Sequence, residues 1–206
     1  LPACEIRGEG IFLQLNKNKI KDWLNENPLV NQRIEGIIAA LLEEEKKGIK
    51  RSEVVITPTF MLIHTLSHAL IRQLCLHSGY SAASIKERIY TGNNSPEMTG
   101  LLLYTGTSDS DGTLGGLARQ AEPDLFSVLF KGAINQANWC ASDPLCMDGI
   151  STISESYNLA ACHSCMLSPE TSCEHFNKFL DRALLIGLPD NKNIGFFSKL
   201  YGVDFD

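Results

Sequence analysis

The sequence lacks the short motifs that mark several familiar enzyme classes. It contains no Gly-Lys-Ser/Thr and no Gly-x-Gly-x-x-Gly, so it holds neither a P-loop nor a dinucleotide-binding turn. It also has no His-x-Lys, which a phospholipase-type nuclease would need. A membrane-spanning run is missing too, because the longest apolar stretch, residues 60–76, contains His64, His68 and Arg72 and is too short and too polar. We therefore expect no membrane partner.

The chain has fewer basic than acidic residues. The 206 residues contain 18 Lys and Arg against 24 Asp and Glu, which gives a net charge of -6. This balance argues against non-specific nucleic-acid binding by the whole surface and makes a protein partner at least as good an expectation as DNA. Direct DNA contact would depend on scattered basic residues, namely Arg51, Lys86, Arg88, Arg119 and Lys131.

The chain opens without a signal peptide, and Leu1 is not an initiator methionine, so we expect a piece of a longer protein. Its seven cysteines are an awkward number for an oxidising compartment, because one thiol would stay unpaired. A reducing cytoplasm accommodates the same set as a metal site plus free thiols at Cys4 and Cys75. The prediction is a cytoplasmic protein.

Five of the seven cysteines lie within residues 140–173, two of them as Cys162-His-Ser-Cys165. A two-residue gap lets both thiolates converge on one tetrahedral ion from a tight turn, which is typical of zinc sites. Cys146 and Cys173 would complete a Cys4 site for Zn²⁺, with Cys140 as the alternative fourth ligand. Because residues 140–173 contain few large apolar side chains, metal binding would supply folding energy that the segment lacks.

Two other interpretations of these cysteines stay open. Cys162 and Cys165 could form a redox pair if both thiols were free and exposed. Alternatively, the thiols could be buried without a ligand. The neighbouring cysteines favour metal capture over both.

Hydrophobic periodicity predicts a mixed α/β, helix-rich single domain with a small β-sheet. Residues 31–47 have amphipathic helical spacing, and Thr57-Pro58 begins a helix that is apolar nearly all round and stops at Ser78-Gly79. Strands are expected within residues 6–15, at 85–90 and at 100–105. Further helices are expected at 123–138 and at 174–185, the latter with Phe176 and Phe179 facing inward.

Two more features could bind a ligand. His64 and His68 lie four residues apart on one helix face, as in metal-binding helices, but no glutamate follows His64 as in zinc peptidases, which favours a core or interface pair. The other is a polar, glycine-rich loop before a predicted helix, which could meet a phosphate or a partner. Its residues are Thr105, Gly106, Thr107, Ser108, Asp109, Asp111, Gly112, Gly115 and Gly116.

The order of these motifs resembles the MrfA-like zinc-binding domain, which lies at the C-terminus of certain superfamily-two helicases and in companion proteins of the bacterial DISARM anti-phage system. The resemblance covers roughly residues 55–185, and the spacing of Cys140, Cys146 and Cys173 is similar to the DrmB type. It rests on His64-Thr-Leu-Ser-His68, Glu87-Arg-Ile-Tyr90, Leu103 to Leu117, Cys146, Cys162-His-Ser-Cys165, Cys173, Asn177 and Leu180-Asp-Arg182.

This resemblance implies a MrfA-like domain at residues 55–206 after an N-terminal extension at residues 1–54. It also implies four cysteine ligands for zinc and a helicase subunit (DrmA-like) as partner. The expected function is a non-catalytic zinc-binding module that makes protein or DNA contacts. The alternative is a metal-dependent nucleic-acid hydrolase that uses the Gly106–Leu117 loop with His64 and His68.

Overall fold

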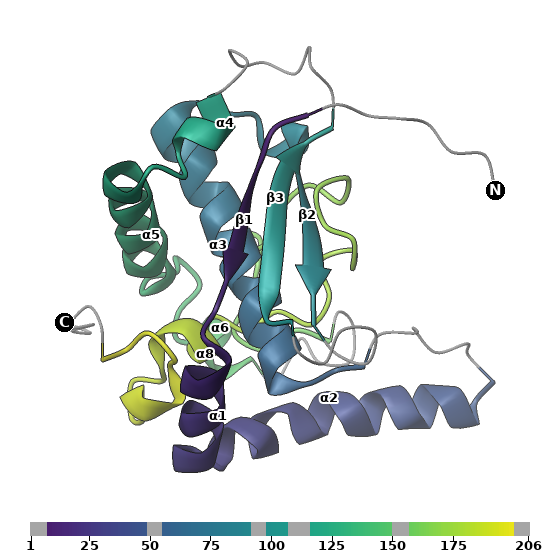
Figure 1. The fold of residues 1–206 in the computed structure, drawn as a ribbon. Helices are drawn as coiled ribbons and strands as arrows, with labels where there is room; N and C mark the ends of the chain where they lie inside the picture. Colours follow the sequence, from purple (N-terminus) through teal and green to yellow (C-terminus); the bar gives the residue numbers. More distant parts are fainter. Residues whose placement is uncertain (1–7, 49–54, 92–97, 107–115, 150–156, 200–206) are drawn as a thin grey trace.

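A computed structural model describes residues 8–48, 55–91, 98–106, 116–149 and 157–199 (Figure 1). The helices and strands in these ranges, in chain order, are β1 Gly10–Gln14, α1 Lys17–Glu26, α2 Leu29–Lys46, α3 Pro58–Ser78, the 3-10 helix η1 Ala82–Ser84, β2 Ile85–Tyr90, β3 Gly100–Thr105, α4 Gly116–Arg119, α5 Pro123–Ala137, α6 Leu145–Asp148, α8 Ala183–Ile186 and the 3-10 helix η3 Lys192–Ile194.

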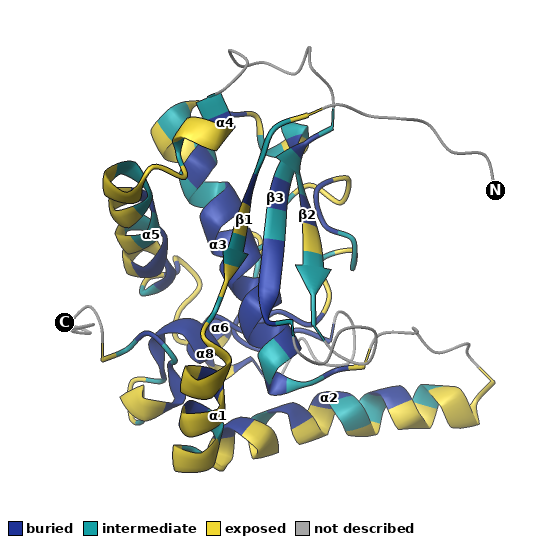
Figure 2. Cartoon of the chain, in the orientation of Figure 1, coloured by how far each residue is buried: buried dark blue, intermediate teal, exposed yellow. Residues whose placement is uncertain are grey.

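Helix α3 is the centre of the molecule, as its apolar sequence predicts. The Thr57 hydroxyl caps it by accepting the Phe60 N–H at 3.1 Å, Pro58 occupies its first turn, and Gly79 ends it with a left-handed φ of 72°. The helix is buried along most of its length (Figure 2). Among the described residues, no helix combines the length and apolarity that a membrane crossing requires.

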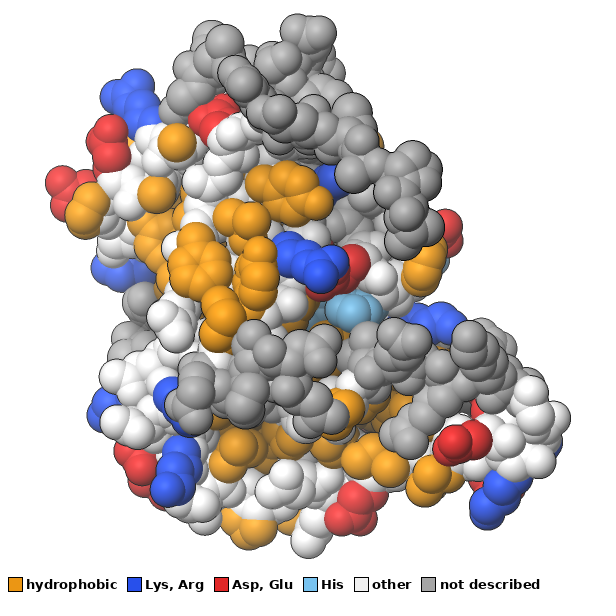
Figure 3. Space-filling view, turned by 45° about the vertical axis from the view of Figure 1, so that its right-hand side comes forward, with side chains coloured by type: hydrophobic (Ala, Val, Ile, Leu, Met, Phe, Trp, Pro, Cys, Tyr) orange, Lys and Arg blue, Asp and Glu red, His pale blue; other side chains and the backbone are white. Residues whose placement is uncertain are grey.

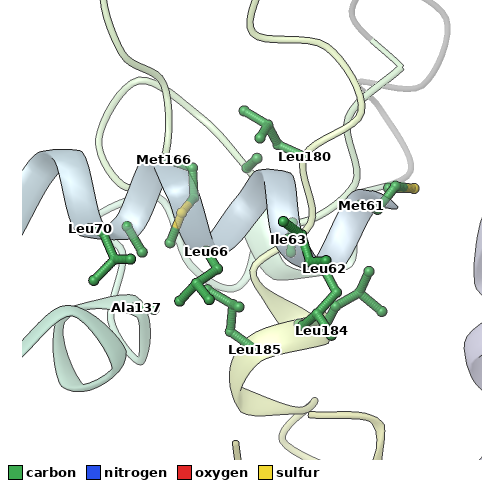
Figure 4. Packing of buried hydrophobic residues seen from close by; sticks show 14 of the residues in the cluster. Met61, Leu62, Ile63, Leu66, Leu70, Ala137, Met166, Leu180, Leu184 and Leu185 are labelled. Atoms are coloured by element: carbon green, nitrogen blue, oxygen red, sulfur yellow. The ribbon is translucent and has the colours of Figure 1, made fainter. Parts of the chain in front are cut away.

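The core forms where α3 meets α5, α8 and the segment after Cys165. Leu66 lies beside Leu185 of α8, and Met166 packs on the same helix from the cysteine-rich segment (Figure 4). These side chains are almost fully buried. Burial of a leucine-sized side chain stabilises a fold by about 1.5–3 kcal/mol. The core therefore anchors the loop-rich C-terminal half to one helix.

The sheet has three antiparallel strands in the order β1-β3-β2. The apolar strand β3 is central, and its Leu103 pairs with Ile11 of β1 and with Glu87 of β2. Helix α3 lies behind this sheet (Figure 1). The N-terminal segment thus contributes an edge strand to the sheet, while the proposed boundary at residues 54 and 55 stays a prediction.

Residues 174–185 do not form the helix that we predicted. The backbone instead turns repeatedly, with left-handed φ values of 53° at Phe176, 59° at Asn177 and 67° at Phe179, and only Ala183–Ile186 is helical. Phe176 is 67% exposed instead of facing inward. The Asn177 side chain accepts the Ser168 N–H at 2.9 Å and donates to the Ser168 carbonyl at 2.8 Å. These contacts stabilise a turn that an α-helix cannot contain.

Candidate metal centre

Four sulfur atoms meet at one place in the structure. Cys140, Cys146, Cys162 and Cys165, here called the cysteine cluster, have Sγ atoms that all lie within 4.8 Å of one another. The Cys140–Cys162 separation is 3.4 Å, Cys146–Cys165 is 3.7 Å and Cys162–Cys165 is 3.8 Å. These distances exceed the roughly 2.05 Å of a disulfide, and all four cysteines are free.

Backbone turns aim these thiols inward. The Cys162 carbonyl accepts N–H groups from Cys165 at 3.1 Å and Met166 at 2.9 Å, which closes the Cys-x-x-Cys turn. The Cys162 N–H in turn points at Cys165 Sγ, at 3.3 Å, and the Ser142 N–H points at Cys140 Sγ, at 3.4 Å. N–H groups directed at sulfur favour the thiolate form, because they place positive partial charge beside it.

Two arginines hold this region against the helical core. Arg72 of α3 donates to the Ser164 carbonyl at 2.8 Å, inside the Cys162–Cys165 turn. Arg182 donates to the Ala137 carbonyl at the end of α5, at 3.0 Å, and pairs with Asp143 between Cys140 and Cys146. The Arg182 side chain is fully buried. The guanidinium groups therefore join both halves of the cysteine cluster to neighbouring elements.

The thiols of the cysteine cluster cannot all ionise by themselves. Burial opposes ionisation of Cys162, but hydrogen bonds with the Cys140 thiol and the Ser164 N–H lower its pKa to about 6. Hydrogen bonding with Cys165, together with burial, raises the pKa of Cys146, and burial raises the pKa of Cys140. Four thiolates at this spacing would repel one another, so they need a cation among them.

The geometry fits a tetrahedral zinc ion. Zinc bound by thiolates at about 2.3 Å places the sulfur atoms about 3.8 Å apart. The three separations of 3.4, 3.7 and 3.8 Å agree with this value. Four sulfur donors also favour zinc over the harder cations magnesium and calcium.

Cys173 does not join this group, although the expected set included it. The structure brings Cys140 to Cys146, Cys162 and Cys165, and it places Cys173 Sγ 3.2 Å from His64 Nε2. The set that the structure gathers therefore holds the alternative fourth cysteine. The sequence left open whether Cys146 or Cys140 was the fourth ligand, whereas the structure gathers both, and the left-handed backbone at Phe176 and Asn177 follows Cys173 where it lies against α3.

A second group of potential ligands surrounds Cys173. His64 and His68 on α3, Glu87 on β2 and Cys173 lie within 4.8 Å of one another and are all buried; we call them the histidine cluster. His64 and His68 are completely buried, and their role as a core or interface pair stays a prediction. We assigned no role to Glu87 from the sequence. A signal existed in the sequence. Glu87 lies two residues from Ile85 and two from Ile89, so all three side chains point to the same face of the strand, and a carboxylate on that apolar face is unusual.

The glycine-rich loop lies mostly beyond the described ranges. Thr105 ends β3, Gly106 lies beside Lys86, and Gly116 begins α4. Thr107, Ser108, Asp109, Asp111, Gly112 and Gly115 fall within residues 107–115, outside the described part of the chain. A phosphate or partner role for this loop remains a prediction from the sequence.

Comparisons with known proteins show what this chain is similar to. Residues 66–166 match the family described as the MrfA Zn-binding domain. The chain is also 39% identical over 203 residues to the DISARM protein DrmB of Bacillus paralicheniformis. Both comparisons agree with the MrfA-like resemblance that the sequence motifs indicate. The alignment with DrmB includes 97% of this chain and 35% of the relative, so the chain spans about a third of that protein's length.

The MrfA Zn-binding domain match bears on the choice of ligands. Its range, residues 66–166, includes all four members of the cysteine cluster. Of the histidine cluster it includes only His68 and Glu87, because His64 precedes it and Cys173 follows it. The cysteine cluster is therefore the better assignment for the zinc that the family description names.

Proposed function

We propose that this chain is a non-catalytic zinc-binding module of a DrmB-like protein in DISARM anti-phage defence, and that it works through contacts with a helicase subunit. The observation that supports this proposal most directly is the cysteine cluster, which offers four sulfur donors at the spacing of a tetrahedral metal site. Similarity to DrmB and the MrfA Zn-binding domain match support the assignment to this kind of protein. Zinc would be held by Cys140, Cys146, Cys162 and Cys165.

A structural role follows from the number of donors. Four thiolates complete the tetrahedral shell and leave no position for water or substrate. A bound ion would supply a cross-link between residues 140–146 and 162–165, which belong to separate turns. The consequence is a stable loop surface beside the core, because metal binding adds free energy where little apolar area is buried.

The surface near this cross-link suits a protein partner. Trp139 is 72% exposed and Leu145 is 76% exposed, and both flank cysteines of the cluster. Large exposed apolar side chains are typical of protein interfaces. On the face shown in Figure 3, Lys and Arg side chains are scattered among acidic ones, an arrangement that favours a protein over DNA as the main contact.

The hydrolase alternative receives less support. His64 and His68 are both 0% exposed, so a nucleic-acid substrate cannot touch them in this conformation. A hydrolytic metal site keeps an open coordination position toward substrate. The buried pair is better suited to a structural role.

The proposal is tested by measuring zinc content, DNA binding and helicase binding on the purified chain. Elemental analysis compares the wild type with Cys146→Ser and with Cys75→Ser, a cysteine outside both clusters. We expect Cys146→Ser to lose one zinc per chain and Cys75→Ser to lose none. Binding to the helicase subunit of the same system is then measured for Trp139→Ala, with Leu76→Ala, an exposed residue on α3, as the control.

We expect helicase binding to weaken at least tenfold in Trp139→Ala and to stay unchanged in Leu76→Ala. Salt-dependent affinity for single- or double-stranded DNA without helicase binding would instead make nucleic acid the target. Equal zinc content in wild type and Cys146→Ser would overturn the zinc assignment. Turnover of DNA by the wild-type chain would overturn the non-catalytic role.

A further inference from the structure

We propose that the histidine cluster is a second metal site, in which His64, His68, Glu87 and Cys173 bind one divalent ion of the zinc class. The four residues come from three separate parts of the chain: α3, β2 and the turn after Ser172. All four are buried, and their ligand atoms lie within 4.8 Å of one another. The proposal is independent of the cysteine cluster, since the two groups share no residue.

The hydrogen bond of His68 leaves its inner nitrogen ready for a metal. His68 Nδ1 lies 2.8 Å from the Met166 carbonyl, and a carbonyl can only accept, so Nδ1 carries the proton. In the neutral ring Nε2 therefore has a free lone pair. This buried atom has no hydrogen-bond partner among the described residues. In metal-binding histidines, the ring nitrogen that does not bind the metal usually donates a hydrogen bond to a carbonyl or a carboxylate, as Nδ1 does here.

Glu87 presents an oxygen to the same point. The Ser67 hydroxyl donates to Glu87 Oε2, which orients the carboxylate and leaves Oε1 directed at the histidines. Oε1 lies 3.0 Å from His64 Nε2 and 3.6 Å from His68 Nε2, and within the described ranges it accepts no hydrogen bond. The lone pairs of Glu87 Oε1 and His68 Nε2 thus face each other inside the protein. Such an arrangement is unfavourable unless a proton or a metal ion lies between them, and the nearby Cys173 sulfur makes the site a four-donor metal site.

Two backbone N–H groups point at the sulfur of Cys173, although burial and the Glu87 carboxylate raise the pKa of its thiol, so the bound ion itself would have to favour the thiolate. The two N–H groups come from His175, at 3.4 Å, and from Asn177, at 3.3 Å. The left-handed backbone at Phe176 and Asn177 makes this double contact available. N–H groups that converge on sulfur stabilise the charged form of a cysteine that binds metal. The left-handed turn, which the structure has in place of the predicted helix, therefore directs backbone N–H groups at the sulfur of Cys173.

The distances and charges suit zinc. Nitrogen and oxygen ligands at about 2.0–2.2 Å and sulfur at about 2.3 Å in a tetrahedron lie about 3.4–3.6 Å from one another. The observed separations are 3.0 Å for His64 to Glu87, 3.2 Å for His64 to Cys173 and 3.6 Å for His68 to Glu87. One carboxylate and one thiolate neutralise a divalent ion, which is favourable in a site closed to water.

The test counts metals in the wild-type chain and removes the two groups separately. Elemental analysis for zinc and other first-row metals should find two equivalents per chain. Cys173→Ser and His68→Gln should each fall to one equivalent, whereas the exposed-residue control His77→Gln should keep two. Cys146→Ser removes one ligand of the cysteine cluster and should keep the metal of the histidine cluster.

Cobalt titration of the metal-free chain gives a second measurement. In Cys146→Ser one equivalent of cobalt should show the weak sulfur charge-transfer absorption of a single thiolate and the visible bands of a mixed nitrogen, oxygen and sulfur shell. The four-thiolate spectrum should then appear only in chains with an intact cysteine cluster. If the cysteine cluster binds no metal, only the four-thiolate spectrum is missing and the mixed-shell spectrum remains. The two proposals can therefore fail separately.

The second site is overturned if the metal content of the wild type, whether one or two equivalents, survives unchanged in Cys173→Ser and His68→Gln. If those two variants do not fold, X-ray absorption on the wild type decides. A shell of sulfur alone would exclude the site, and a shell in which sulfur is mixed with nitrogen and oxygen would support it.

Discussion

At the scale of single residues, buried charge organises this protein. Arg182 is a fully buried guanidinium that contacts Asp143 and the Ala137 carbonyl. Arg33 similarly makes a two-point contact with buried Asp181, at 2.6 and 3.2 Å. The two carboxylates, Asp143 and Asp181, lie outside helices and strands, in backbone without a regular hydrogen-bond ladder. The arginines therefore replace hydrogen bonds that helices and strands would otherwise provide.

We predict that Arg182→Met destabilises the chain by about 2–4 kcal/mol. The substitution keeps the apolar stem but leaves the Ala137 carbonyl unsatisfied and separates Asp143 from its buried partner. Urea unfolding measures the change. The control is Arg88→Met, because the Arg88–Glu174 pair lies at the surface and should contribute less than about 1 kcal/mol. Equal losses in the two variants would contradict the importance of the buried contact.

At the scale of elements, α3 connects the two clusters. His68 lies in the histidine cluster through Nε2 and holds the Met166 carbonyl through Nδ1, next to Cys165. One turn later, Arg72 holds the Ser164 carbonyl of the same cysteine turn. Residues 64, 68 and 72 are four apart, so they share one face of the helix. The position of α3 thus sets the position of both groups of ligands.

We predict that Thr57→Ala lowers stability by about 1 kcal/mol, because the first turn of α3 then loses its cap on the Phe60 N–H. Thr57→Ser keeps a hydroxyl at the same place and should cost much less. Chemical denaturation of both variants measures the difference. A loss in Thr57→Ser as large as in Thr57→Ala would show that the methyl group matters and the cap does not.

At the scale of the whole molecule, the described chain divides into a regular part and a loop-rich part. The regular part is the sheet with α2, α3 and α5, and the loop-rich part follows Ala137 and packs on α3 and α5 (Figure 1). Residues 157–182 contain turns and no helix or strand. Five of the eight residues that we propose as metal ligands lie in this second part. A bound ion there would add the rigidity that backbone hydrogen bonds supply elsewhere.

Removal of metal should therefore destabilise the chain. We predict that a strong chelator lowers the thermal unfolding midpoint by roughly 10 °C or more, since 1 kcal/mol corresponds to about 2–4 °C for a domain of this size. Differential scanning calorimetry measures the shift, and the same chelator saturated with zinc is the control. Hydrogen exchange should increase first within residues 157–173. An unchanged midpoint would argue against structural metal.

The sequence by itself determined the elements with strong local signals. The Thr57-Pro58 start and Gly79 end of α3 depend on a cap, a ring-restricted φ and a left-handed φ, which are properties of the residues themselves. Strands β2 and β3 were predicted with the bounds that the structure has. The Cys162–Cys165 turn was also predictable, because its two ligands are close in the chain.

Only the tertiary structure decided which distant residues meet. The sequence favoured Cys173 as a partner for Cys162, with Cys140 only as an alternative fourth ligand, but the structure places Cys140 in the cysteine cluster and Cys173 with His64, His68 and Glu87. Residues 87 and 173 belong to elements that are far apart in the chain and are brought together by packing against α3. Local sequence patterns carry no information about such contacts, because they result from how the core closes. Local signals existed at His64, His68 and Glu87, but only the folded chain shows that these residues meet one another and Cys173.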